Sequence, residues 1–140
     1  MKPELHDEVH EIVLKIVNAS EVDDQKTVWS VYQELVKLCE DSEKAEINHP
    51  FQWETLGDFT SDKSIALKFY GKALNYAVSA ELYEYISSIC LAMSEAYLEL
   101  GSLDQAKYFA AQANEAAFAT SDLELRKDIS ELLLQLSNRT

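Results

Sequence analysis

Apolar residues recur along this chain every three or four positions, which is the spacing of one face of an α-helix and differs from the alternation of a strand. Over residues 1–18 the pattern predicts a helix that ends near Asn18. A second helix follows and runs into the polar segment 40–46, with apolar positions Val28, Val31, Tyr32, Leu35, Leu38 and Cys39. Residues 1–48 are therefore predicted to form an N-terminal helical pair.

Five further helices are predicted from residue 50 onward. Pro50 favours the first turn of a short third helix that ends near Phe59, because proline needs no amide hydrogen bond there. Gly101 is expected to end the fifth helix with a positive φ. The N-capping residues that should open the other helices are Ser20, Ser61 with Asp62, Ser79, Ser102 and Ser121. Residues 50–120 then hold two helical hairpins and residues 121–138 a capping helix, in one all-α domain over residues 1–140.

The expected interior contains both tryptophans and both cysteines. Trp29 and Trp53 are predicted to be core residues because each lies in an apolar helical stretch. Cys39 and Cys90 also lie in apolar stretches and lack CxxC spacing, so we expect buried thiols. This use of cysteine favours a reducing, cytoplasmic environment.

An internal repeat relates the predicted fourth and sixth helices. Residues 40 positions apart match in kind, in the pairs Ala66 and Ala106, Phe69 and Phe109, Ala73 and Ala113, and Ala77 and Ala117. A repeat of this length indicates stacked helical hairpins. Alanines at these positions allow a neighbouring helix to approach closely, so we expect Ala106 and Ala113 at a helix contact.

The second hairpin resembles a tetratricopeptide repeat (TPR), through Tyr97, Gly101, Ala106 and Ala113. The first hairpin is similar to the same family, through Trp53, Leu56, Gly57, Ala66, Tyr70, Ala73 and Leu74. The resemblance covers residues 50–138 and implies a TPR-like stack of about seven antiparallel helices. Residues 49–74 also look similar to small acidic bacterial repeat proteins that serve as immunity partners of secreted toxins.

Acidic residues outnumber basic ones throughout the chain, with 25 Asp and Glu against 12 Lys and Arg and a net charge of −13. Such a potential repels nucleic acid and anionic lipid and attracts basic partners, although it also favours solubility. The acidic start is unlike a signal peptide, and no apolar run approaches the roughly 18 residues of a membrane span. We therefore expect a soluble cytoplasmic protein whose partner is a basic protein or peptide.

The sequence HDEVH at residues 6–10 resembles the zinc-binding pattern His-Glu-x-x-His. His6 and His10 would lie one helical turn apart, but Asp7 replaces the glutamate that activates water in such sites. The remaining histidine, His49, follows far along the chain beside Pro50. We interpret His6 and His10 as residues at the edge of a helix face, and we predict no metal, cofactor or catalytic residue.

Carboxylates mark the first helix of each predicted hairpin. Glu54 and Asp58 lie four residues apart in one, as do Glu95 and Glu99 in the other, so each pair shares a helix face. Residues 50–62 and 81–100 contain no Lys or Arg, which argues against the basic clamp by which some TPR proteins hold a carboxyl terminus. If the stack curves as TPR stacks do, the four acids line or rim its inner surface and select a basic ligand. The alternative is an ordinary solvated face.

Two tyrosines, Tyr83 and Tyr85, precede the second of these acidic helices. Aromatic residues are enriched at binding hot spots, so both are candidates for partner contact. The alternative is that they cover a gap between helices.

These features predict a non-enzymatic protein–protein interaction module for a basic partner. The leading specific prediction is a cognate inhibitor, or immunity protein, of a toxin, since a small acidic domain can occlude a basic toxin and associate with it quickly. The alternative is a secretion chaperone or adaptor that holds a partner's helix in the groove. A metal-dependent hydrolase ranks third, and a homo-oligomer is compatible with the sequence.

Overall fold

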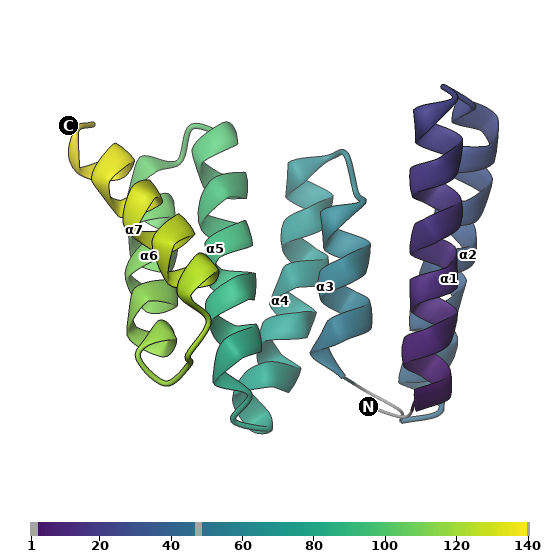
Figure 1. Ribbon diagram of the computed structural model, residues 1–140, viewed down its shortest axis with the longest axis horizontal. Helices are drawn as coiled ribbons and strands as arrows, with labels where there is room; N and C mark the ends of the chain where they lie inside the picture. Colours follow the sequence, from purple (N-terminus) through teal and green to yellow (C-terminus); the bar gives the residue numbers. More distant parts are fainter. Residues whose placement is uncertain (1–2, 47–48, 140) are drawn as a thin grey trace.

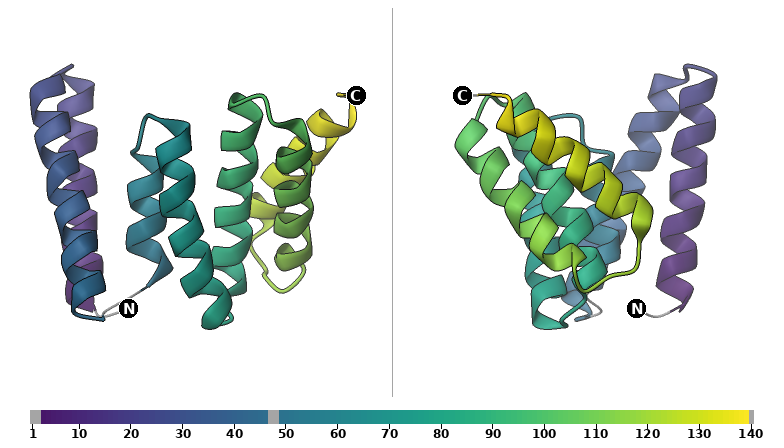
Figure 2. Two further views of the ribbon diagram at one scale, coloured as in Figure 1. Left: turned by 180° about the vertical axis from the view of Figure 1, so that it is seen from behind. Right: turned by 60° about the vertical axis from the view of Figure 1, so that its left-hand side comes forward.

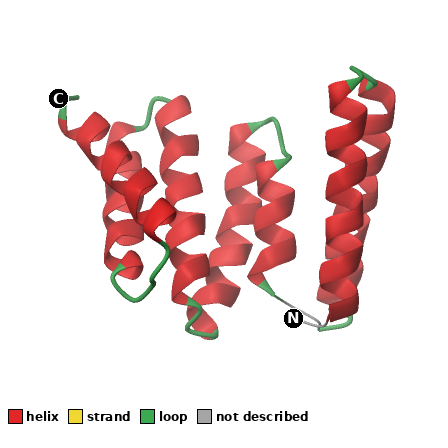
Figure 3. Ribbon diagram, viewed as in Figure 1, coloured by secondary structure: helices red, strands yellow, loops and turns green. Residues whose placement is uncertain are grey.

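The computed structural model describes residues 3–46 and 49–139, and all regular structure in these two ranges is α-helical (Figures 1 and 3). The seven helices found there are α1 (Pro3–Glu21), α2 (Gln25–Lys44), α3 (Pro50–Asp58), α4 (Lys63–Ser79), α5 (Tyr83–Glu99), α6 (Leu103–Ala117) and α7 (Leu123–Ser137). This confirms the predicted all-α class and the expected number of helices. The boundary expected at residue 48 lies outside the described residues.

The helices form two layers. α1, α3, α5 and α7 touch one another in sequence along one layer, and each even-numbered helix packs against its neighbours in the chain. Figure 1 is seen from the side of α1 and α7, and the left view of Figure 2 from the side of α2 and α6. The first helix of every hairpin therefore contributes to the same face of the molecule.

Three of the local signals behave as the sequence predicts. Pro50 occupies the first turn of α3, where the His49 ring accepts a hydrogen bond from the Phe51 amide at 3.1 Å. Asp62 opens α4, and its carboxylate accepts hydrogen bonds from the amides of Ser64 and Ile65. Gly101 has φ +78° just beyond α5, the left-handed conformation that glycine adopts most easily.

Several predicted serine caps are wrong. Ser20 lies inside α1, because that helix continues to Glu21, and Asp24 caps α2 instead through the Thr27 amide. Ser79 is the last residue of α4, and Leu82 precedes α5 without a side-chain cap. Ser102 stands at its predicted position but makes no capping hydrogen bond, and Asp122 caps α7 in place of Ser121. At α2 and α7 a carboxylate, with two acceptor oxygens, takes the role that the sequence assigned to a nearby hydroxyl.

The core is continuous along the stack. One buried cluster joins α1 to α5 and includes Val9, Leu35, Trp53, Ala73 and Ile89. Two smaller clusters join α5 and α6 to α7, with Cys90, Ala113, Ile129, Ala106, Ala110, Leu132 and Leu136 as members. Both cysteines are buried free thiols, as predicted. The single-domain organisation remains a prediction.

Trp29 contradicts its predicted place in the core, because 66% of its surface is exposed. The buried residues of α2 are Val31, Leu35, Cys39 and Ser42, which follow one another at intervals of three or four. On a helical wheel at about 100° per residue, Trp29 lies about 120° from Leu35 at the centre of that buried face. The tryptophan therefore contributes to the surface and not to the interior of the protein.

The predicted repeat is visible in the burial pattern. The six alanines of the repeat are all buried, and Phe69 and Phe109 are both half-buried against the core. Ser87 and Ser94 of α5 donate hydrogen bonds across the interface to the carbonyl oxygens of Ala113 and Ala106, at 2.8 and 2.6 Å. Small side chains on both helices thus permit direct contact between a side chain and the opposite backbone.

We expect Ala113→Leu to destabilise the protein by about 1–3 kcal/mol through overpacking of the α5–α6 contact. Ala113 is fully buried, and its own carbonyl oxygen accepts the Ser87 hydrogen bond, so α6 cannot move outward without breaking that bond. Urea unfolding measures the change, with Ala111→Leu on the exposed side of α6 as the control. Equal stability of the two variants would show that this contact is loosely packed.

Candidate functional site

Five carboxylates lie on the layer formed by the first helices of the hairpins. They are Glu54 and Asp58 of α3, Glu95 and Glu99 of α5, and Asp128 of α7, and we call them the acidic face. α5 touches both α3 and α7, which brings the three helices together. Partial burial raises the pKa of Glu95, and repulsion from Asp128, Glu99 and Asp58 raises it further. The carboxylates are therefore near enough to interact.

Glu54 is the most enclosed of these acids. Its Oε2 atom accepts a hydrogen bond from the Ser88 hydroxyl of α5 at 2.6 Å. Burial raises the pKa of Glu54 to about 7, Asp58 adds to the rise, and the Ser88 hydrogen bond opposes it. A positive group placed beside Glu54 would offset the cost of desolvating this carboxylate.

Asp58 is held by an aromatic hydroxyl. The buried Tyr70 of α4 donates a hydrogen bond from its hydroxyl to Asp58 Oδ1 at 2.6 Å. Desolvation by its neighbours raises the pKa of Asp58, and the Tyr70 hydrogen bond and nearby Lys63 oppose the rise. Although Asp58 borders solvent, one oxygen is thus fixed and the other is free of this bond.

Lys63 approaches the acidic face from the start of α4. Its Nζ atom lies 3.8 Å from Glu99 Oε2, and both side chains are well exposed. An exposed pair of this kind contributes little to stability, so Lys63 can be displaced at small cost. The face keeps its negative character, because its five carboxylates outnumber this lysine.

A hollow of about 340 Å³ adjoins the acidic face between α3, α5 and the start of α7. It combines acidic and aromatic side chains, and its lining residues are Phe51, Glu54, Glu84, Tyr85, Ser88, Asp122 and Leu125. Carboxylates beside aromatic rings suit the charged head and apolar stem of a lysine or arginine.

The structure brings the four predicted acids together, but it places only one of the two predicted tyrosines beside them. Glu54, Asp58, Glu95 and Glu99 come together across α3 and α5, and Tyr85 lines the adjoining hollow with its ring 5.1 Å from that of His49. Tyr83 is exposed and is not part of the hollow's lining. Their role in partner binding remains a prediction.

Sequence reasoning missed the contributions of Ser88, Asp122 and Asp128. The sequence predicts α7 only as a capping helix, yet it packs on α5 as the first helix of a further hairpin would. Treating it as such would have placed Asp128 on the same face as Glu95. Ser88 could have been found from its position on α5, two turns before Glu95.

The raised pKa of Glu54 predicts a pH dependence of stability. An unfolded glutamate titrates near 4.5, whereas Glu54 titrates at about 7, so between these values the folded state holds more protons than the unfolded state. The free energy of unfolding should therefore fall as pH rises through this window. Glu54→Gln removes that titration while leaving an oxygen that can accept from Ser88.

Urea unfolding at about pH 5 and about pH 8 tests this prediction. The stability of Glu54→Gln relative to the parent should increase between the two pH values. Glu115→Gln, an exposed change on α6, should follow the parent at both. Parallel pH curves for the parent and Glu54→Gln would show that Glu54 titrates as an ordinary surface acid.

The two histidines of the HDEVH segment lie on the exposed side of α1, whereas Val9 between them belongs to the core. His6 is exposed and stacks on Phe51 of α3, with ring centroids 4.7 Å apart, and His10 is exposed one turn further on. In the part of the chain that the structure describes, no three His, Cys, Asp or Glu side chains are grouped as a metal ion requires. His6 thus contributes to the contact between α1 and α3.

Comparison with known proteins identifies the class of fold. No family model and no curated protein sequence matches the chain. Among solved structures it is similar to PcrH, seen in complex with the chaperone binding region of PopD, with a TM-score of 0.57 and 19% identity over 96% of this chain and 94% of that one. This likeness confirms a TPR-like helical stack. No helix among the described residues is long and apolar enough to cross a membrane.

Proposed function

We propose that this protein is a non-enzymatic binding module that holds a basic segment of a partner protein against its acidic face, as a chaperone or adaptor does. The observation that carries the proposal is the gathering of five carboxylates on α3, α5 and α7, of which Glu54, Asp58 and Glu95 are partly desolvated. The fold supports it, because PcrH has a similar stack and was solved with a chaperone binding region of another protein.

A basic segment fits this face for a physical reason. Carboxylates that repel one another raise the energy of the free protein, and lysine or arginine side chains relieve that repulsion on binding. Glu54, with a pKa of about 7, is charged in only part of the molecules near neutral pH, so a nearby cation would favour its ionised form. Long-range attraction from the net charge of −13 would also speed encounter.

The inhibitor function favoured by the sequence has less support. It rests on acidity and small size, which serve a chaperone equally well, whereas the chaperone or adaptor function is also supported by the fold of PcrH. A hydrolase function gains nothing from the geometry, because His6 stacks on Phe51 and the described residues contain no group of three possible metal ligands.

Binding of two synthetic helices tests the proposal. One is a lysine–alanine peptide of about 15 residues, and the other has glutamate at every lysine position. The lysine peptide should bind, and more weakly at 1 M than at 0.1 M salt, because the screening length falls from about 10 Å to about 3 Å. Fluorescence anisotropy of the labelled peptides measures both effects. Equal affinity for the two peptides would refute selection for basic segments.

A further inference from the structure

A second surface lies along the side of the stack that carries the turn after α1 and the turn after α3. Both turns point to the same side of the molecule (Figure 1). Between them are two adjoining hollows of about 450 and 470 Å³, which share Val28, Tyr32 and Phe59. Because their linings overlap, they form one continuous depression, which we call the apolar groove.

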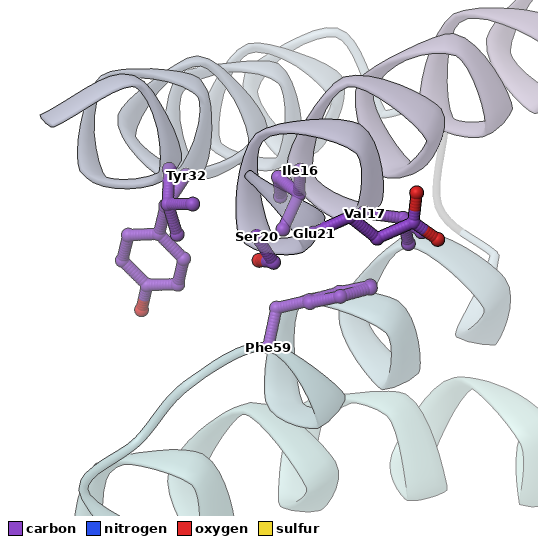
Figure 4. A pocket seen from close by; sticks show the side chains of 7 residues that line it. Ile16, Val17, Ser20, Glu21, Tyr32 and Phe59 are labelled. Carbon is purple, nitrogen blue, oxygen red and sulfur yellow. The ribbon is translucent and has the colours of Figure 1, made fainter. Parts of the chain in front are cut away.

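The walls of the apolar groove are mainly hydrophobic and accessible. Ile16 and Val17 of α1 lie on one side, facing the Phe59 ring (Figure 4). Trp29 and Ile65 line the other part, and they are 66% and 43% exposed. Contiguous apolar surface of this kind on a soluble protein marks a binding site more often than isolated exposed residues do.

The floor of the groove is held in place by a hydrogen bond. Tyr32 and Thr60 share a hydrogen bond between their hydroxyl groups at 2.7 Å, which connects α2 to the turn after α3. The Thr60 hydroxyl also lies 2.7 Å from the Leu56 carbonyl oxygen. The phenol ring of Tyr32 is thus fixed beneath the groove, so the depression exists before any ligand binds.

Charge indicates what could occupy the groove. Its lining contains the acids Glu21 and Asp62 and no lysine or arginine. A second copy of this chain would bring the same acids to the interface, where an isologous contact would place like charges near each other. A segment with bulky apolar side chains and flanking lysine or arginine complements both the walls and the rim.

We propose that the apolar groove binds an amphipathic segment of the partner protein through large apolar side chains flanked by basic residues. The site is separate from the acidic face, since the two share no residue. This inference rests on the proposed function, because the segment in the groove is part of the same partner protein that the acidic face holds. Each hollow is within the size range of pockets that enclose a small ligand, so each can enclose one or two large side chains.

The position of Trp29 provides a direct assay. The chain has two tryptophans, and Trp53 is buried, so a change in the environment of an exposed tryptophan reports on Trp29. The probe is a synthetic amphipathic helix of about 15 residues with leucines on one face and lysines on the other. Two matched peptides replace its lysines by glutamate or its leucines by serine. Only the leucine–lysine peptide should shift the tryptophan emission to the blue, and Trp29→Phe should abolish the shift.

Two substitutions on one helix locate the binding. Ile65→Lys places a positive charge in the groove and should weaken binding of the leucine–lysine peptide about tenfold. Val78→Lys makes a like change at a 55% exposed residue of α4 outside the groove and should leave the affinity unchanged. Circular dichroism verifies that both variants are folded.

The outcomes separate this inference from the proposed function. Glu95→Lys with Glu99→Lys should keep the blue shift, even if those substitutions abolish binding of the lysine–alanine peptide. The inference is overturned if no peptide shifts the emission, if all three shift it equally, or if Val78→Lys weakens binding as much as Ile65→Lys. Sedimentation that shows a dimer lost in Ile65→Lys would also overturn it, by assigning the groove to a second copy.

Discussion

Gly57→Ala is expected to destabilise the protein by about 1–3 kcal/mol through overpacking, although alanine is the better helix former by about 1 kcal/mol. A Cβ atom on Gly57 would meet the Tyr70 ring at 2.6 Å from Cε1 and 2.8 Å from Cδ1. Tyr70 is buried and is tied to Asp58 by its hydroxyl. The ring cannot turn aside without leaving the core and losing that charge-assisted bond.

Gly71 offers a matched control for this experiment. It lies within α4, and an added Cβ would have no atom within 4 Å. Gly71→Ala should therefore stabilise the protein by up to about 1 kcal/mol through helix propensity. Denaturant unfolding compares the two variants with the parent. If Gly57→Ala were as stable as Gly71→Ala, the close approach of α3 to Tyr70 would be wrong.

Reversing Glu95 and Glu99 to lysine is expected to slow association of the lysine–alanine peptide by about tenfold or more at low salt. The two residues lie at the centre of the acidic face, where the pKa of Glu95 responds to acids on both neighbouring helices. The substitution also removes the contact of Glu99 with Lys63, but that pair is exposed and its loss should cost little stability.

The control variant has the same net charge as the variant in which Glu95 and Glu99 are reversed. Glu11→Lys with Glu115→Lys changes the net charge by the same amount at exposed positions of α1 and α6. Stopped-flow kinetics at two salt concentrations measures the association rates. The Glu95 and Glu99 variant should be the slower, and the difference should shrink at high salt. Equal rates for the two variants would mean that net charge, and not the acidic face, attracts the peptide.

The parts of the fold that the sequence predicts well depend on local chemistry. Proline at a helix start and glycine with a positive φ each follow from the residue's own backbone, as Pro50 and Gly101 show. The alanine repeat was predictable because buried contacts between helices demand small side chains at regular intervals. These signals can be recognised without knowledge of the tertiary contacts between helices.

Features that depend on distant neighbours were harder to predict. Trp29 is a large aromatic residue in an apolar stretch, so its type favours the core. Its angle to the buried face of α2 shows that it is exposed. The raised pKa of Glu54 results from its burial in the folded protein, and the hydrogen bond from Ser88 of α5 opposes the rise. Asp128 joins the acidic face because α7 packs on α5, which the pattern of α7 alone does not indicate.

Nuclear magnetic resonance can map where the lysine–alanine peptide binds on the protein. Amide chemical shifts of the isotope-labelled protein are recorded as the peptide is added. We expect the largest changes on α3, α5 and α7, at Glu54, Ser88, Glu95 and Asp128. Changes confined to α2, α4 and α6, or spread evenly over the surface, would contradict the acidic face as the site that holds a basic partner.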